Sequence, residues 1–281
     1  MILAARPQAM TLRTPNTGDR LRCIESPHNP LVKELRKCFA QRELAADQSC
    51  AIEGFHILEE AIRSGLKFRA VFFSSSAEPR AERLLQQIAA HVETVLLPDR
   101  LFASVVPTDA PQGVAALVRC KAFSLKDVLA KAVIGPLIAV AGVQDPGNLG
   151  TILRSAEAFE AGGVLLGEGT VSPFNSKAVR ASAGSVFRLP LAKVAFSEVL
   201  DQLREQGMRL IATSSHKGTP LPEARLTGPL TFFVGNEGAG LPRDLLGKMD
   251  ETIVIPHSSK VESLNAGIAA SIVLYEIARQ K

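Results

Sequence analysis

The segment that most constrains the fold is residues 230–274, near the C-terminus. A mainly apolar run at 230–234 leads into the small and polar residues 235–240, and a second run at 252–255 leads into a loop at 256–261. A long apolar helix is predicted to begin near Glu262. Strands that lack hydrophobic alternation are typical of parallel sheets covered on both faces. Ligands bind such sheets at the carboxyl ends of the strands, so these two loops are predicted to share one pocket.

The rest of the C-terminal half repeats this pattern. Strands are predicted at 137–141, 163–166, 187–194 and 209–213, alternating with helices at 149–159, 177–183 and 196–205. This alternation predicts an α/β fold with a mostly parallel sheet.

The N-terminal half predicts a smaller α/β domain. Its expected helices are at 27–42, 57–64 and 82–90, and its expected strands are at 68–73, 95–97 and 112–118. The predicted organisation is a basic, disordered tail (1–22), a first domain (23–120), a linker (121–135, with a helix at 125–132) and a second domain (136–281).

Positive charge gathers at the N-terminal end of the 281 residues. The net charge is +4, and residues 1–42 hold eight basic and three acidic side chains. A basic end on a nearly neutral body favours a polyanionic partner, although charge alone is weak support. Residues 1–22 are compatible with a loose tail or with an organellar transit peptide. The candidate RNA-binding side chains on the first predicted helix are Lys33, Arg36 and Lys37.

The four cysteines contain no Cys-x-x-Cys pair. This pattern predicts free thiols in a reducing compartment, hence a cytoplasmic protein, and no metal site. No apolar run is long enough to cross a bilayer, so no membrane association is expected.

Common nucleotide-binding and zinc-binding motifs are missing. The loop after the first C-terminal strand, residues 145–150, lacks Gly-x-Gly-x-x-Gly spacing, and the chain contains neither a phosphate loop nor His-Glu-x-x-His. Three polar clusters remain at strand ends: Asn148 with Arg154, Asn236 with Glu237, and Ser263 with Asn265. Each of them taken alone fits a simpler explanation, in which Asn148 and Ser263 cap helices and Arg154 faces solvent.

Together the three clusters resemble the motifs of the SpoU (TrmH-type) family of RNA ribose 2′-O-methyltransferases, in the SPOUT superfamily. The matching segments are 145–156, 233–241 and 255–266, with a further match at 175–184. A weaker likeness over 24–118 is to the family's ribosomal-protein-like substrate-binding domain. Departures from the family pattern occur at 257–259 and 266–267.

The resemblance implies a trefoil knot, a homodimer and S-adenosylmethionine as cofactor, with Arg154 of one subunit facing the cofactor of the other. It implies these cofactor-binding residues: Thr213, Gly235, Asn236, Glu237, Ile255, Ser263 and Leu264. It implies these catalytic residues: Arg154, Asn148, Glu237, Ser263 and Asn265. Lys177 and Arg180 join the candidate substrate-binding residues.

The implied reaction is attack by a ribose 2′-hydroxyl on the donor's methyl group. A guanidinium resists deprotonation, so Arg154 is expected to fix the target phosphate and stabilise the developing alkoxide. The proton acceptor stays open between Arg154, an RNA phosphate and, less favoured, His257. Ribosomal RNA is preferred over transfer RNA as substrate. A non-catalytic RNA-binding assembly factor is the alternative from another class, and a methyltransferase that confers antibiotic resistance is a third.

Overall fold

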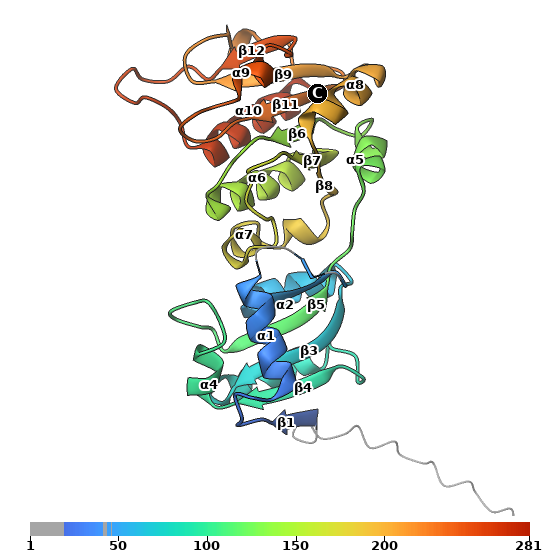
Figure 1. Cartoon of the computed structure of the whole chain (residues 1–281), viewed down its shortest axis with the longest axis vertical. Coiled ribbons are helices and arrows are strands. Elements are labelled where there is room, and N and C mark those ends of the chain that lie inside the picture. Colours follow the sequence, from blue (N-terminus) through green and yellow to red (C-terminus); the bar gives the residue numbers. More distant parts are fainter. Residues whose placement is uncertain (1–19, 42–43, 46) are drawn as a thin grey trace, which may run out of the picture.

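The computed structural model describes residues 20–41, 44–45 and 47–281. The described chain forms two α/β domains stacked along the long axis of the molecule (Figure 1). Most of the predicted tail, residues 1–19, lies outside the described residues. Its last two residues, Leu21 and Arg22, differ from the expectation because they belong to a strand.

The N-terminal domain contains a five-stranded mixed sheet in the order β1-β4-β3-β5-β2. Strands β1 and β3 run parallel to β4, whereas β5 runs antiparallel to β3 and β2. Its elements are β1 (Leu21–Cys23), α1 (Pro30–Ala40), β2 (Ser49–Glu53), α2 (Phe55–Arg63), β3 (Lys67–Ser74), α3 (Glu78–Leu85), β4 (Glu93–Leu97), α4 (Asp99–Ala103) and β5 (Val114–Arg119). Strands β1 and β2 and helix α4 are additions to the predicted elements, and α3 begins and ends earlier than the expected 82–90.

The C-terminal domain contains a seven-stranded sheet in the order β10-β12-β9-β11-β6-β7-β8, and its strand pairings are parallel. This confirms the predicted parallel α/β architecture. Its elements are α5 (Leu125–Lys131), β6 (Leu137–Val140), α6 (Pro146–Ala158), β7 (Gly163–Leu166), α7 (Ser176–Ala181), β8 (Leu191–Lys193), α8 (Phe196–Glu205), β9 (Arg209–Ser214), β10 (Thr219–Pro220), β11 (Leu230–Val234), α9 (Arg243–Leu246), β12 (Glu251–Val254) and α10 (Ala266–Gln280).

Two sequence predictions in this half are wrong. The expected strand 187–194 is reduced to β8, because a left-handed turn at Ala183 (φ 48°) and Gly184 (φ 85°) leads into a 3₁₀ turn at Ser185–Phe187. The last helix begins at Ala266 instead of near Glu262. Its N-cap is Asn265, whose Oδ1 accepts hydrogen bonds from two backbone amides of the first turn.

The sheet is buried on both faces, as its unalternating strands predicted. Every residue of β6, β7 and β11 is buried. Helices α6 and α10 pack against each other on one side, and α5 and α8 cover the other (Figure 1). The helix of the expected linker, α5, contributes the fully buried Val128 to this second core.

A trefoil knot stays a prediction of the resemblance. Within the described residues, no helix is long and apolar enough to cross a membrane.

Candidate active site

The carboxyl ends of four neighbouring strands carry the predicted motifs. Val234 at the end of β11 pairs with Val140 at the end of β6, and β9 lies between β11 and β12. The loops after these strands therefore meet at one edge of the sheet. A direct contact confirms this, because Asn236 Nδ2 donates a hydrogen bond to the carbonyl oxygen of Gly142 (2.9 Å).

A chain of side-chain hydrogen bonds connects the three polar clusters. Asn265 Nδ2 donates to Asn148 Oδ1 (2.7 Å), and Asn148 Nδ2 donates to Glu237 Oε1 (2.8 Å). Residues 117 and 89 positions apart in the sequence thereby become direct partners. Because each amide has only one donor end and one acceptor end, the arrangement fixes the orientation of the Asn265 and Asn148 amide groups.

Asn148 is free for this role because another residue caps its helix. The N-cap of α6 is Asp145, whose Oδ1 accepts a hydrogen bond from the backbone N–H of Asn148 (2.9 Å), and Pro146 occupies the first helical position. Asp145 Oδ2 accepts a hydrogen bond from Lys177 Nζ (2.7 Å). The bond from Lys177 and the backbone bond from Asn148 lower the pKa of the Asp145 carboxyl. The simpler explanation of Asn148 as a helix cap is therefore wrong.

The loop after β11 is held in a tight turn by its own backbone. Asn236 and Gly240 exchange two backbone hydrogen bonds of 3.0 Å, and Asn236 Oδ1 accepts two more from the N–H groups of Gly238 and Ala239. A Cβ on Gly235 would lie 2.3 Å from the carbonyl carbon of Gly240. Only glycine fits at position 235 while this turn keeps its shape.

These loops enclose a cavity of about 460 Å³. This volume is within the range of small-molecule sites, roughly 300–1,000 Å³. Its wall combines apolar side chains with polar groups, and all seven predicted cofactor-binding residues are in it. The residues that line the cavity are Thr213, Ser214, Ser215, His216, Val234, Gly235, Asn236, Glu237, Gly238, Ala239, Gly240, Leu241, Leu246, Ile255, His257, Glu262, Ser263, Leu264, Ala266 and Ala269.

Two features of the wall restrict its chemistry. Thr213 Oγ1 donates to the carbonyl oxygen of Phe233 (2.8 Å), so its hydroxyl oxygen remains an acceptor. His257 Nδ1 lies 2.7 Å from the carbonyl oxygen of Ile255, which fixes Nδ1 as the protonated nitrogen and leaves Nε2 unprotonated in the neutral ring. The described wall contains Glu237 and Glu262 but neither lysine nor arginine.

Three of the predicted catalytic residues lie outside the cavity wall. Asn148 and Asn265 are one hydrogen bond away from it, through Glu237 and between themselves. Arg154 is exposed on α6, and no described residue forms a hydrogen bond or ion pair with it. Ser263 is exposed at the cavity rim. The catalytic roles of these residues stay predictions.

Sequence reasoning missed the segment Ser214–His216, which lines the cavity. The sequence did contain a signal for it, because this segment directly follows Thr213, a predicted cofactor-binding residue at the end of an expected strand.

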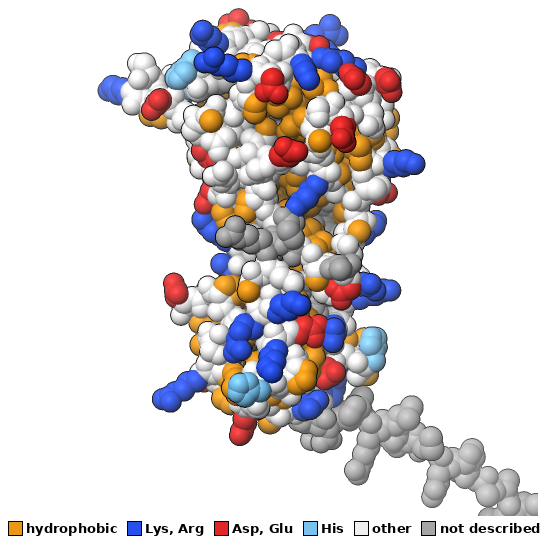
Figure 2. Space-filling view, in the orientation of Figure 1, with side chains coloured by type: hydrophobic (Ala, Val, Ile, Leu, Met, Phe, Trp, Pro, Cys, Tyr) orange, Lys and Arg blue, Asp and Glu red, His pale blue; other side chains and the backbone are white. Residues whose placement is uncertain are grey.

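The predicted substrate-binding residues fall into two groups. Lys33, Arg36 and Lys37 are exposed on α1, where Figure 2 shows basic side chains gathered over the N-terminal domain. Lys177 and Arg180, on α7, are instead paired with acidic residues of this chain. The RNA contacts of all five stay predictions.

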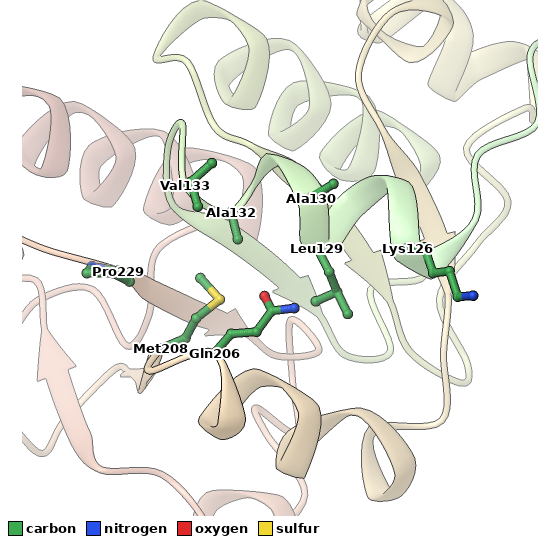
Figure 3. Close-up of a pocket in the computed structure, with 8 residues that line it drawn as sticks. All are labelled: Lys126, Leu129, Ala130, Ala132, Val133, Gln206, Met208 and Pro229. Carbon is green, nitrogen blue, oxygen red and sulfur yellow. The ribbon is translucent and has the colours of Figure 1, made fainter.

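A second cavity, of about 500 Å³, lies at the opposite edge of the sheet. Figure 3 shows it between α5 and the segments that precede β9 and β11, with Met208 and Leu129 in its wall. Its wall is mainly apolar, and its polar side chains are Lys126 and Gln206. Since it opens at the amino ends of the strands, far from the motif loops, the smaller cavity is the better candidate for the reaction.

Comparison with known protein families gives two matches. Residues 136–275 match the SpoU rRNA Methylase family, and residues 29–116 match the MRM3-like substrate binding domain. The 23S rRNA (guanosine(2553)-2′-O)-methyltransferase RlmP of Bacillus subtilis is 32% identical over 254 residues, covering 90% of this chain and 98% of that protein. The chain belongs to the SpoU family.

Solved structures agree with this assignment. The AdoMet-bound rRNA methyltransferase from Sinorhizobium meliloti superposes with a TM-score of 0.79 at 27% identity, over 92% of this chain and 98% of its own. The SpoU methyltransferase AviRb from Streptomyces viridochromogenes, in complex with AdoMet, gives 0.80 at 26% identity, over 90% and 98%. Family membership confirms the resemblance and the predicted enzyme class, an RNA ribose methyltransferase with S-adenosylmethionine as cofactor.

Proposed function

We propose that this protein methylates a ribose 2′-hydroxyl of ribosomal RNA and holds S-adenosylmethionine in the cavity between the motif loops. The observation that carries the proposal is the hydrogen-bonded chain Asn265–Asn148–Glu237, which joins the three family motifs beside that cavity. The RlmP relative, which matches over nearly its whole length, supports ribosomal RNA as the substrate.

The residues of the cavity wall fit the cofactor. Leu241, Ile255 and Leu264 offer apolar surface for an adenine ring, and the backbone of 235–240 offers polar groups. A wall with two carboxylates and neither lysine nor arginine among its described residues suits a ligand that carries a sulfonium cation. When bound, the cofactor supplies a methyl group that is already activated for transfer, so the chain must mainly align the target hydroxyl.

Arg154 is proposed to bind the phosphate next to the target ribose. A guanidinium remains protonated, so it supplies a fixed positive charge that stabilises an alkoxide as it forms. Its exposed position and its absence from the cavity wall support delivery to the cavity of a second copy of the chain.

An apolar stripe on α10 supports the proposed homodimer. Ile268 and Tyr275 are 52% and 56% exposed, and Ile272 lies between them on the same helical face. This face is close to α6, since Ser271 Oγ lies 2.6 Å from Ser155 Oγ, the residue after Arg154. A dimer formed through α10 would therefore bring Arg154 near the interface.

Two inactive variants test the shared site. Arg154→Ala should abolish methyl transfer and change S-adenosylmethionine affinity less than threefold, measured by calorimetry. Leu264→Trp, which fills the cavity, should abolish cofactor binding. Co-refolded in equal amounts, the two variants should recover roughly a quarter of the wild-type rate, because mixed dimers contain one complete site. No recovery would refute the site shared between subunits.

The RNA substrate is tested directly. The purified protein should transfer methyl groups from S-adenosylmethionine to ribosomal RNA from a strain that lacks this gene, and not to transfer RNA from the same strain. Blocked alkaline cleavage next to the modified nucleotide would locate the 2′-O-methyl group. Methylation of transfer RNA alone would refute ribosomal RNA as the substrate. We further propose that the enzyme acts in the cytoplasm.

A further inference from the structure

Two arginines of the C-terminal domain bind carboxylates of the N-terminal domain. Arg180 Nη1 lies 3.7 Å from Glu53 Oε2 and donates a hydrogen bond to Thr108 Oγ1 (3.1 Å). Arg188 Nη1 donates to Glu60 Oε2 (2.9 Å). Both arginines belong to the C-terminal domain and both carboxylates to the N-terminal domain, at the contact between the domains where α7 faces α2 (Figure 1).

Glu53 is the most enclosed member of this contact. Its side chain is only 3% exposed, and its Oε2 also accepts a hydrogen bond from Thr108 Oγ1 (2.5 Å). A buried carboxylate is costly unless it is paired and hydrogen-bonded. Glu53 therefore favours the one arrangement of the two domains in which Arg180 reaches it.

The helix that carries Arg180 also contacts the candidate active site. Lys177, one turn earlier on α7, donates to Asp145, the N-cap of the helix that holds Asn148. The two helices are in close contact, because a Cβ on Gly150 would lie 2.5 Å from Ala181 Cβ. Six residues of α7 thus link the N-terminal domain to the motif loops.

We propose that Arg180 is a positioning residue that, paired with Glu53, holds the N-terminal domain in the orientation that presents bound RNA to the methyl-donor cavity. The proposal rests on the proposed function. It gives Arg180 a role different from a direct RNA contact, because the guanidinium already faces a carboxylate.

A double-mutant cycle of Glu53→Gln, Arg180→Ala and the double variant tests the pairing. Glu53→Gln can still accept the hydrogen bond from Thr108, so the N-terminal domain should fold. Each single variant should lower kcat/KM for RNA about tenfold, and the double variant should be no worse. Arg180→Lys should restore part of the loss. Cofactor affinity, measured by calorimetry, should change less than twofold.

The matched control is the pair Arg209–Glu251 within the C-terminal domain, with a similar separation of 3.6 Å and an arginine of similar exposure. Arg209→Ala and Glu251→Gln should leave kcat/KM for RNA within twofold of wild type.

Two results would overturn the proposal. One is that the losses of the two single variants add up in the double variant. The other is that Glu53→Gln is fully active, whereas in Arg180→Ala the slope of log RNA affinity against log salt concentration is smaller than in wild type by about one; this would assign Arg180 to an RNA phosphate.

An experiment without RNA distinguishes a failure of this proposal from a failure of the proposed function. Hydrogen–deuterium exchange in residues 53–64 and 180–188 should speed up equally in both single variants. If the wild type methylates no RNA but exchange in these residues speeds up equally in both single variants, the domain contact stands and the proposed function fails. Unchanged exchange in both variants would overturn the inference on its own.

Discussion

The substitution Asn148→Asp is the strongest test of the hydrogen-bonded chain Asn265–Asn148–Glu237. In the wild type, Asn148 Nδ2 lies 2.8 Å from Glu237 Oε1. The substitution keeps the shape of the side chain and replaces the donor with an oxygen, so that two carboxyl groups face each other. Two unit charges about 3 Å apart repel by about 1.5 kcal/mol in water and about 6 kcal/mol at an effective dielectric constant of about 20.

Protonation limits this penalty. The introduced carboxyl escapes the repulsion by keeping its proton, which costs an ordinary aspartate about 4 kcal/mol at pH 7. For these partly buried groups we expect a loss of about 2–4 kcal/mol at pH 7, or roughly 5–15 °C in Tm.

The sign of the pH dependence follows from the introduced carboxyl, whose pKa is expected to rise on folding. Destabilisation is then greatest above the folded-state pKa and is relieved as the pH falls towards the unfolded value. The control Asn148→Ala loses the hydrogen bond to Glu237 and also the one from Asn265, without adding charge, at a cost of about 1–2 kcal/mol that does not depend on pH.

Thermal unfolding between pH 5 and 8.5 compares the two variants. Asn148→Asp should melt several degrees below Asn148→Ala at pH 8 and approach it near pH 5. Parallel melting curves for the two variants over this range would refute the direct contact between Asn148 and Glu237.

Three further predictions concern the surroundings of the site. Asn265→Ala removes the N-cap of α10 and should lower the free energy of unfolding by about 1–2 kcal/mol in urea titrations, whereas Asn265→Ser should recover most of the loss. Gly150→Ala should cost about 1–3 kcal/mol by forcing α6 away from α7, whereas Gly238→Ala, whose nearest neighbour would be 3.7 Å away, should cost less than about 1 kcal/mol in the same assay. The hydrogen bonds from Arg188 lower the pKa of the Glu157 carboxyl, so their stabilisation is present above its ordinary value of 4.5 and is lost as the pH falls through the folded-state value. Arg188→Met should therefore be destabilised by about 1–2 kcal/mol at pH 7, and its difference from wild type should shrink as the pH falls below 4.5, as followed by urea titration across pH.

Regular strands and helices of the C-terminal domain were predictable because local patterns agree with the fold. The predicted segments 163–166, 196–205 and 230–234 have the bounds found in the structure. In contrast, strand β1 has three residues and depends on pairing with β4, so its own sequence carries no signal. Residues 187–194 have the apolar composition of a strand, but Phe187 is buried in a turn that the positive φ of Gly184 makes possible.

The candidate site was predictable in its members but not in its contacts. The family motifs pointed to Asn148, Glu237 and Asn265. Hydrogen bonds in the fold decide which residue caps each helix, and therefore which amide side chain is left for other partners. The spacing of residues in the sequence does not reveal these bonds. Asp145 and Asn148 are both good cap residues three positions apart, and the fold selects the first.

Charge explains why Arg154 would act from outside the cavity of its own chain. A sulfonium donor is a cation, so an arginine fixed in the same cavity would weaken cofactor binding by repulsion. An RNA phosphate needs positive charge close to the target ribose. If a second copy supplies Arg154 across the interface, the cavity keeps its acidic wall and the guanidinium approaches the RNA from the other side. The acidic wall, the exposed arginine and the apolar stripe of α10 are three separate observations that this arrangement accounts for together.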